Sequence, residues 1–275
     1  MKAYSPKEYW AGLADNFHSA DTAGFAPILH PGAPAWFNSR IDHLQFCAMR
    51  RALALAEVSR PARILDVGCG TGRWLRRYCD LGFDATGIDA TPQMLRLARG
   101  RGTMAPLVTG EANRLPFRSA EFDVVSDVTV IQHIPAARQE QALLEMTRVL
   151  KPGGRMILFE LIRGEDLHIF PRNPQSWMDL GASCGLRARG WFGQEYLLLD
   201  RLFVRVARGV MKRRETSVAT GVDSAETMSS RATILRRVYW ELRHGIVPLS
   251  AWAEPIVGRL CPGRLATHGV FVFQK

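Results

Sequence analysis

The chain has 275 residues, of which 47% are hydrophobic and 23% charged, and its formal net charge is +10. This length and composition are typical of a folded globular protein and exclude a chain that is disordered throughout. No uninterrupted apolar run approaches the ~20 residues that cross a bilayer, and the first residues, "MKAYSPKEYW", lack the apolar core of a secretory signal. The five cysteines are scattered without a C-x-x-C pair. We therefore expect a cytoplasmic protein with reduced thiols, without a disulfide framework or a metal site.

The positive charge comes almost entirely from arginine, since 31 of the 36 basic residues are Arg and five are Lys. Genomic base composition explains such a ratio as readily as a nucleic-acid surface does. The excess lies toward the C-terminal end, where residues 193–275 include thirteen basic and seven acidic residues. Basic residues interleaved with aromatic ones, the usual pattern of nucleic-acid surfaces, are lacking. The charge alone is thus weak support for an RNA or protein substrate.

The pattern of the chain divides it into four parts. Residues 1–61 are predicted to form a helical N-terminal cap around the connector "HPGAPAWF", with a helix from Ser39 to about Val58 that Ser39 and Asp42 cap. Residues 62–192 alternate strand and helix. Residues 193–265 have a helical pattern and are predicted to be an insertion or lid, and residues 266–275 return to the pattern of a strand.

The alternating part predicts a parallel sheet that is covered by helices on both faces, because its strands are continuous apolar runs. The expected strands are 62–69, 83–90, 104–112, 122–131, 155–162 and 186–192, and the expected helices are 71–79, 91–99, 136–150 and 176–185. A last strand follows the insertion, so we expect seven strands in all. Ligands of such sheets bind at the carboxyl ends of the strands.

The stretch "ILDVGCGTGRW" (64–74) carries three glycines directly after the first strand. The third glycine comes one residue too early for the dinucleotide fingerprint G-x-G-x-x-G. Glycines at a turn between strand and helix let backbone N–H groups and a helix N-terminus approach a ligand. Asp89 ends the second strand 17 residues beyond Gly72, where a carboxylate can accept hydrogen bonds from both hydroxyls of a ribose. Loop and acid together predict a nucleoside-containing cofactor.

The ordered string "ILDVGCGTGRW…GIDATPQML…GEANRLPF…FDVVSDVTVIQHI…RVLKPGGRMILFE" resembles the class I S-adenosylmethionine-dependent methyltransferases over residues 62–160. Their D-x-G-x-G-x-G motif is matched in full by Asp66, Gly68, Gly70 and Gly72. The resemblance implies a Rossmann-like α/β fold whose seven-stranded sheet is mostly parallel with an antiparallel last strand, and S-adenosyl-L-methionine as the cofactor. Glu111 departs from the pattern, because many members carry Asp there.

The resemblance also assigns roles to residues. The glycine loop would follow the methionine part of the cofactor, and Asp89 would bind the ribose. Glu111 and Ala112 would lie beside the adenine. Met94 would either pack on the adenine or be an ordinary residue of the core. The complete set of expected cofactor-binding residues is Asp66, Gly68, Cys69, Gly70, Gly72, Asp89, Ala90, Met94, Glu111, Ala112, Asp127 and Val128.

Two residues are candidates for catalysis. His133 could remove a proton from an acceptor hydroxyl, although a histidine at this place more often packs structurally. Glu160, at the end of the fifth strand, is placed to face the pocket or to lie exposed at the strand end. Trp10, Trp36, Trp74, Trp177 and Trp191 could supply aromatic walls.

The predicted insertion contains "LLLDRLFVRVARGVMKRR" (197–214), whose spacing predicts an amphipathic helix. Such a helix could lie on an anionic membrane surface, or it could be a lid with its apolar face on the domain. The second interpretation is favoured. The apolar side would be Leu199, Leu202, Phe203, Val206 and Val210, and the basic side Arg201, Arg205, Arg208 and Lys212.

The sequence as a whole predicts a methyltransferase that acts on oxygen, carbon or nitrogen of a small organic metabolite. One alternative is an acceptor such as a lipid or quinone precursor at a membrane surface. Methylation of RNA or protein, and a protein that binds the cofactor without catalysis, are weaker alternatives. Methyl transfer to any acceptor would exclude the last of these.

Overall fold

The computed structural model describes residues 4–15, 33–164, 168–206, 225–260, 263 and 265–275. These residues belong to two compact units, one made of residues 1–194 and 266–275, the other of residues 195–265. The helices of the first unit are α1 (Pro6–Asp15), α2 (Ala35–Leu55), α3 (Arg73–Asp80), α4 (Pro92–Gly100), α5 (Ala136–Val149) and α6 (Pro174–Ser183), with the short 3-10 helix η2 (Ile131–His133). Its strands are β1 (Arg63–Val67), β2 (Asp84–Asp89), β3 (Leu107–Thr109), β4 (Phe122–Val128), β5 (Leu150–Leu161), β6 (Arg187–Gln194) and β7 (His268–Gln274).

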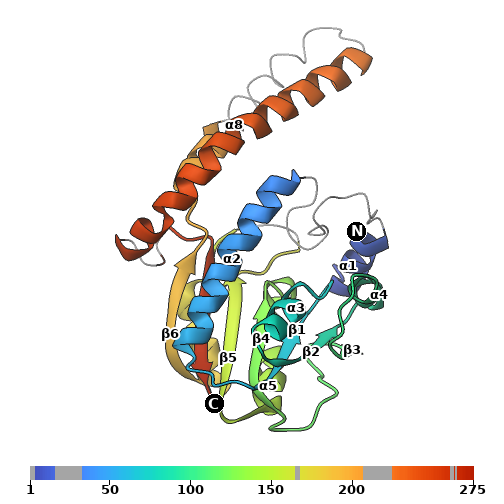
Figure 1. Cartoon of the computed structure of the whole chain (residues 1–275), viewed down its shortest axis with the longest axis vertical. Coiled ribbons are helices and arrows are strands. Elements are labelled where there is room, and N and C mark those ends of the chain that lie inside the picture. Colours follow the sequence, from blue (N-terminus) through green and yellow to red (C-terminus); the bar gives the residue numbers. More distant parts are fainter. Residues whose placement is uncertain (1–3, 16–32, 165–167, 207–224, 261–262, 264) are drawn as a thin grey trace. The chain divides into compact units, whose positions relative to one another are not determined.

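The seven strands form one sheet in the order β3-β2-β1-β4-β5-β7-β6. The strands from β3 to β5 run parallel to one another, whereas β7 lies antiparallel between β5 and β6 (Figure 1). The predicted class I methyltransferase fold with its antiparallel last strand is thereby confirmed. The strand order reverses between β1 and β4, and their carboxyl ends are where a sheet of this kind binds ligands.

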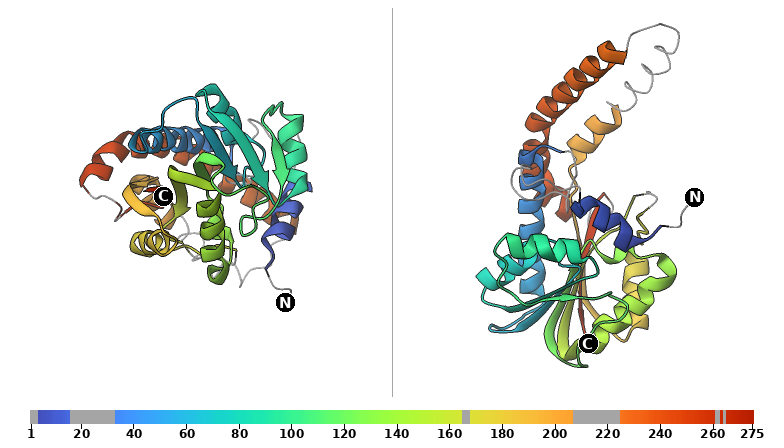
Figure 2. Two further views of the ribbon diagram at one scale, coloured as in Figure 1. Left: turned by 90° about the horizontal axis from the view of Figure 1, so that it is seen from below. Right: turned by 90° about the vertical axis from the view of Figure 1, so that its right-hand side faces the viewer.

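Helices cover both faces of the sheet, with α2 and α3 on one face and α5 on the other (Figure 2). The first face is held by an apolar cluster in which Met49 of α2 and Leu75 of α3 meet Ile64, Val124 and Ile157 of the central strands, all of them fully buried. Complete burial of such side chains contributes about 1.5–3 kcal/mol each. The buried, β-branched strands are therefore the reason why the sheet forms where the sequence predicts it.

The second helix begins earlier than the sequence predicts, at Ala35 instead of Ser39, and ends at Leu55. Pro34 precedes its first turn with extended backbone angles, and the Pro34 carbonyl accepts from the N–H groups of Phe37 and Asn38. A proline at the start of a helix loses no hydrogen bond, because the first N–H groups have no partner within the helix. The expected cap by Ser39 and Asp42 is wrong.

The described helices of the unit of residues 195–265 are residues 198–206 and α8 (Ala225–Leu260). Asp200 joins the two segments. Its carboxylate accepts from Nε and Nη2 of Arg243 at 2.7 and 2.6 Å, and its backbone N–H donates to Ser250 Oγ at 3.1 Å. Of the helices that the structure describes, none is both long and apolar enough to cross a membrane.

Candidate functional site

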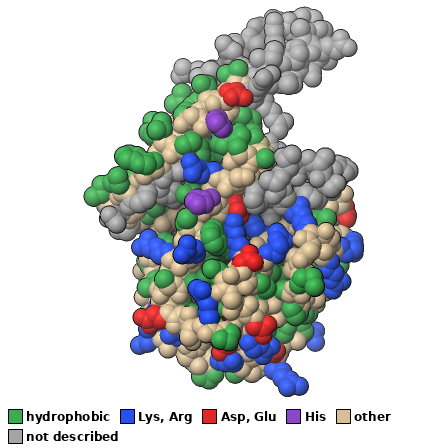
Figure 3. All heavy atoms as spheres, in the orientation of Figure 1, with side chains coloured by type: hydrophobic (Ala, Val, Ile, Leu, Met, Phe, Trp, Pro, Cys, Tyr) green, Lys and Arg blue, Asp and Glu red, His purple; other side chains and the backbone are tan. Residues whose placement is uncertain are grey.

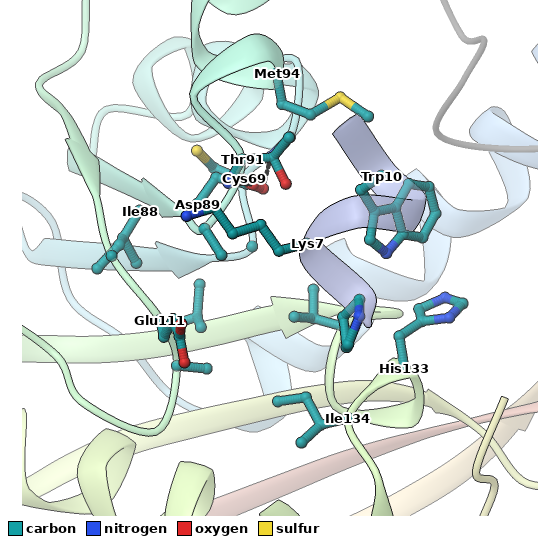
Figure 4. Close-up of a pocket in the computed structure, with 18 of the residues that line it drawn as sticks. Lys7, Trp10, Cys69, Ile88, Asp89, Thr91, Met94, Glu111, His133 and Ile134 are labelled. Atoms are coloured by element: carbon teal, nitrogen blue, oxygen red, sulfur yellow. Dashed lines mark hydrogen bonds between the residues drawn. The ribbon is translucent and has the colours of Figure 1, made fainter. Parts of the chain in front are cut away.

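A pocket opens at the carboxyl ends of β1, β2, β3 and β4, at the point where the strand order reverses. Its floor is the chain that follows β1, and one wall follows β2 and β3. The other wall is the turn after β4, and Lys7 and Trp10 reach into the pocket from α1 (Figure 4). The pocket is thus formed by segments that are far apart in the sequence.

The glycine loop turns sharply from β1 into α3, with Gly68, Gly70 and Gly72 at φ values of 68°, 52° and 73°. Residues other than glycine rarely adopt this left-handed backbone conformation. A Cβ on Gly68 would also lie 2.4 Å from a methyl carbon of Val130, and one on Gly72 would lie 2.4 Å from Thr103 Oγ1. The loop therefore requires glycine for its conformation and for close packing, and backbone forms the floor of the pocket.

Asp89 holds the loop and the start of α4 together. One carboxylate oxygen accepts from the Gly70 N–H at 2.9 Å and the other from the Thr91 N–H at 2.8 Å. Burial raises the pKa of Asp89, and these two N–H groups oppose the rise. A carboxylate has about four acceptor positions, of which the two N–H groups and the Thr91 hydroxyl use three, so both ribose hydroxyls can bond to it only if the Thr91 hydroxyl turns aside. The structure places this carboxylate in the pocket wall, as the ribose assignment requires.

The wall after β2 and β3 has an apolar part beside its polar residues. Ile88 and Met94 are only 1% and 2% exposed, and Glu111 and Ala112 complete the wall. The Glu111 carboxylate extends to Arg138 Nη2, 3.4 Å away, and both side chains are exposed. A flat apolar base such as adenine fits a wall of this composition.

The opposite wall is aromatic. Trp10 of α1 meets the His133 ring edge-on, with centroids 5.0 Å apart, and Tyr9 stacks on His168 at 4.5 Å. His133 and His168 are themselves stacked at 5.5 Å. Ring pairs at these separations attract each other by about 0.5–1.5 kcal/mol beyond their buried area. The contacts fix α1 against the turn after β4.

His133 is held as a neutral imidazole by its partners. Its Nδ1 is 3.0 Å from the His168 carbonyl, which can only accept, so Nδ1 carries the hydrogen. The Gln132 oxygen accepts from the Leu161 N–H at 2.7 Å, so the Gln132 amide nitrogen donates to His133 Nε2 at 3.3 Å. Burial lowers the pKa of His133 to about 4. Both ring nitrogens therefore already have partners.

Glu160 does not face the pocket, contrary to the expectation from the sequence. It is fully buried, and its carboxylate accepts from three successive N–H groups, those of Val130, Ile131 and Gln132, at 2.7–3.0 Å. Asp127, also buried, shares a hydrogen bond with it, and burial raises the pKa of Asp127 well above its usual value. Burial and this shared hydrogen bond favour the protonated form of Asp127. The pair supports the turn that forms the aromatic wall.

Of the twelve residues expected to bind the cofactor, Asp66, Gly72 and Asp127 do not line the pocket. Asp66 and Asp127 lie within the sheet and are 2% and 0% exposed. Gly72 is the last glycine of the loop and caps the N-terminus of α3. The other nine, together with His133, line it, and so do Trp10 and Trp74. Trp177 is instead a core residue with 0% exposure, and Trp191 stacks on Phe271.

Several lining residues escaped the sequence reasoning. Lys7 lies in α1 and Arg138 in the first turn of α5, and neither belongs to a motif. Arg73 directly follows the loop, is 8% exposed, and donates to Asp42 and Gln45 of α2 at 2.8 and 2.9 Å. The available signal is an acid on α2 that can pair with a basic residue after the loop, but in the sequence the same acid also fits the pattern of a helix cap.

The residues present fit S-adenosylmethionine. Nε of Arg73 and Nε1 of Trp74 are buried N–H donors of the pocket wall that have no partner within the described structure. Such donors suit a carboxylate, as the methionine part of this cofactor carries. Asp89 supplies acceptors for hydroxyls. Among the described residues, no group of three side chains could hold a metal ion.

Comparison with known proteins agrees with this site. A sequence model described as a methyltransferase domain matches residues 65–158. Demethylmenaquinone methyltransferase of Tropheryma whipplei is 32% identical over 148 residues, 52% of this chain and 61% of that protein. Malonyl-(acyl-carrier protein) O-methyltransferase of Pseudescherichia vulneris is 30% identical over 158 residues, 57% of this chain and 60% of that protein.

A solved structure shares the fold over most of the chain. Phosphoethanolamine N-methyltransferase 2 of Haemonchus contortus, in complex with S-adenosyl-L-methionine, covers 97% of this chain and 60% of its own, with 16% identity and a TM-score of 0.55. The first four curated relatives are matched over only 34% to 61% of their length. The glycine loop, Asp89 and these sequence matches together identify residues 65–158 as a methyltransferase domain of the class I S-adenosylmethionine-dependent type.

Proposed function

We propose that this protein transfers the methyl group of S-adenosylmethionine to a small organic acceptor. The supporting observation is that one pocket joins the glycine loop and Asp89 to the aromatic wall of Trp10 and His133. Cofactor and acceptor would therefore share a single enclosed space. Proximity in such a space accounts for much of the acceleration of a transfer between two bound molecules.

The N-terminal helix supports an acceptor of limited size. α1 packs against α4 on one side and, through Trp10 and Tyr9, contacts the two stacked histidines on the other. A helix that spans the pocket in this way excludes water and leaves room for a compact molecule rather than for a polymer.

The acceptor most compatible with this pocket brings its own nucleophile. His133 has both ring nitrogens bonded, and Asp89 accepts from two backbone N–H groups. Glu111 is paired with Arg138, and burial raises the pKa of Cys69, whose thiol stays protonated. None of these four lining side chains is therefore free to act as a general base. We therefore propose an amine, or an acid that is already ionised at neutral pH.

The roles of the chain's own residues follow from their positions. Bound S-adenosylmethionine supplies an electrophilic methyl group on a positively charged sulfur. Asp89 would hold the ribose, Arg73 and Trp74 the carboxylate, and Ile88 and Met94 the adenine. Trp10, His133 and Ile134 would orient the acceptor and exclude water. No side chain needs to take up a proton when the acceptor is a carboxylate, or an amine that has already lost its ammonium proton to solvent. Methyl transfer then leaves a neutral ester or a protonated methylated amine.

The test is to incubate the protein with S-adenosylmethionine and a panel of small amines, carboxylic acids and phenols, and to measure S-adenosylhomocysteine by mass spectrometry. We expect acceptor-dependent product that Asp89→Ala abolishes, whereas His133→Gln retains kcat within about tenfold. Product from none of the acceptors, despite measured binding of S-adenosylhomocysteine, would favour a protein that binds the cofactor without catalysis.

A second candidate is a hydrophobic acceptor, a lipid or quinone precursor, taken from a membrane. Two observations favour it: a relative is named as a demethylmenaquinone methyltransferase, and the described part of residues 195–265 exposes many large apolar side chains. Presenting a phenolic lipid in vesicles and in detergent would decide between the candidates, because a membrane-derived acceptor should react faster from the vesicles.

A further inference from the structure

The unit of residues 195–265 exposes large apolar side chains along one side of α8. Trp252 and Leu260 are 77% and 76% exposed, and the other members are 49–60% exposed. We call these side chains the α8 stripe, and Figure 3 shows hydrophobic side chains gathered along this helix. The α8 stripe consists of Val238, Leu242, Leu249, Trp252, Ile256 and Leu260.

The spacing of the α8 stripe places it on one side of the helix. At about 100° per residue, its six members fall within an arc of roughly 80°, and from Val238 to Leu260 they extend over about 33 Å. The buried residues Arg243, Val247 and Ser250 lie on the other side of α8. Arg243 and Ser250 bind Asp200 of the neighbouring helical segment. α8 therefore has one side that packs within its unit and another that is apolar and exposed.

The neighbouring segment exposes apolar side chains of its own. Leu199, Leu202 and Val206 are 50–61% exposed and share one side of the helix at residues 198–206. Arg201 and Arg205 of the same segment are exposed as well. Monomeric proteins seldom leave this many large apolar side chains of one unit exposed to water unless the side chains bind something. The surface therefore calls for a partner.

The charge of residues 195–265 distinguishes between two kinds of partner, a second copy of the chain and a lipid surface. Residues 195–265 include twelve basic and seven acidic residues, so a second copy would bring like charge against like. An anionic lipid surface would be attracted instead, and it accepts apolar side chains into its outer layer. A tryptophan among the most exposed residues of the stripe fits the boundary between lipid and water, where such rings are enriched.

We propose that the α8 stripe docks on an anionic lipid surface, with α8 lying in the plane of the headgroups and the stripe turned into the acyl boundary. The sequence offered membrane contact at residues 197–214 as the less favoured alternative to a lid, and Arg208, Val210 and Lys212 of that stretch lie outside the described residues. The structure assigns the larger apolar surface to α8 instead. This proposal does not depend on the methyl-transfer reaction.

The test uses the full chain and sedimentation with vesicles. Vesicles of phosphatidylcholine alone are compared with vesicles that also contain phosphatidylglycerol, at low and high salt. The variant combines Leu249→Glu and Trp252→Glu, and the control is Leu144→Glu, which alters a 47% exposed leucine of α5 in the other unit. Circular dichroism confirms that each variant is folded.

The wild type and the control should sediment with the anionic vesicles, less at high salt, while the double variant loses more than about tenfold in partition coefficient. Brominated lipid should also quench more fluorescence from the wild type than from Trp252→Phe. Failure of the wild type to bind anionic vesicles at low salt would overturn the proposal. So would equal binding by the double variant. A dimer in sedimentation velocity that the double variant loses, without vesicle binding, would assign the stripe to a second copy instead.

Discussion

Replacing Asp89 is expected to remove cofactor binding while the sheet stays intact. Its carboxylate lies in the pocket wall, where its two oxygens accept from Gly70 and Thr91 and where it is assigned to the ribose hydroxyls. Two variants separate charge from shape, since Asp89→Ala deletes the acceptor and Asp89→Asn keeps the outline with one oxygen instead of two.

The size of the effect follows from the hydrogen bonds. A bond to a charged acceptor contributes about 1.5–3 kcal/mol, so loss of both ribose contacts in Asp89→Ala should weaken binding by about 10²- to 10⁴-fold. Asp89→Asn retains one acceptor and turns an NH₂ group toward a backbone N–H. Its affinity for the cofactor should fall by about ten- to a hundredfold. Each variant also leaves a backbone donor of the loop without its partner, so the free energy of unfolding should fall by about 1–3 kcal/mol.

Isothermal titration with S-adenosylhomocysteine measures the affinities, and urea unfolding measures the stabilities. Asp84→Asn is the matched control, because Asp84 begins the strand that Asp89 ends and its side chain is 67% exposed in a 3.7 Å ion pair with Arg63. This control should bind like the wild type. Wild-type affinity in folded Asp89→Ala would refute the assignment of the ribose to this carboxylate.

Three further predictions concern stability. Gly72→Ala should cost at least about 1 kcal/mol more in urea than Gly185→Ala, because both sites have positive φ but only the Cβ at Gly72 would collide with Thr103; equal costs would contradict this. The unfolded state takes up a proton on His133 near pH 6.5 and the folded state only near pH 4, so the stability that the neutral imidazole confers is present above pH 6.5 and is lost as the pH falls toward 4. The stability difference between wild type and His133→Gln should therefore change by on the order of 3 kcal/mol across that window, and a pH-independent difference would show that His133 titrates normally. Glu160→Gln should destabilise by more than about 2 kcal/mol, because an amide oxygen replaces a carboxylate that accepts three N–H groups, and a loss below about 1 kcal/mol would mean that the turn is held otherwise.

The sheet could be predicted because its strands are buried on both faces. Each expected strand overlaps an observed one, since runs such as "RILDV" and "RMILFEL" have no amphipathic alternation that would suit an exposed strand. The start of α2 could not be predicted from Ser39 and Asp42, because Asp42 is used in tertiary contacts. Its carboxylate binds Arg73 and Arg77 of α3 rather than its own helix.

The site was predictable where backbone geometry demands particular residues. Glycines at positive φ and the strand-end Asp89 can be found by spacing. What the sequence could not indicate is the direction of a side chain at a strand end: Glu160 and Asp127 look like pocket acids, yet both are fully buried, where they share a hydrogen bond and Glu160 binds the turn after β4. Nor could it show that α1 brings Lys7 and Trp10 into the pocket, since that contact depends on tertiary packing.

A crystal structure with S-adenosylhomocysteine tests the central claim most directly, because that claim is about where a ligand lies. We predict both ribose hydroxyls within hydrogen-bond distance of the Asp89 carboxylate, the homocysteine part along Gly68 and Gly70, and the sulfur facing Trp10 and His133. A ligand bound elsewhere in the chain, or one whose ribose does not contact Asp89, would contradict the proposed site.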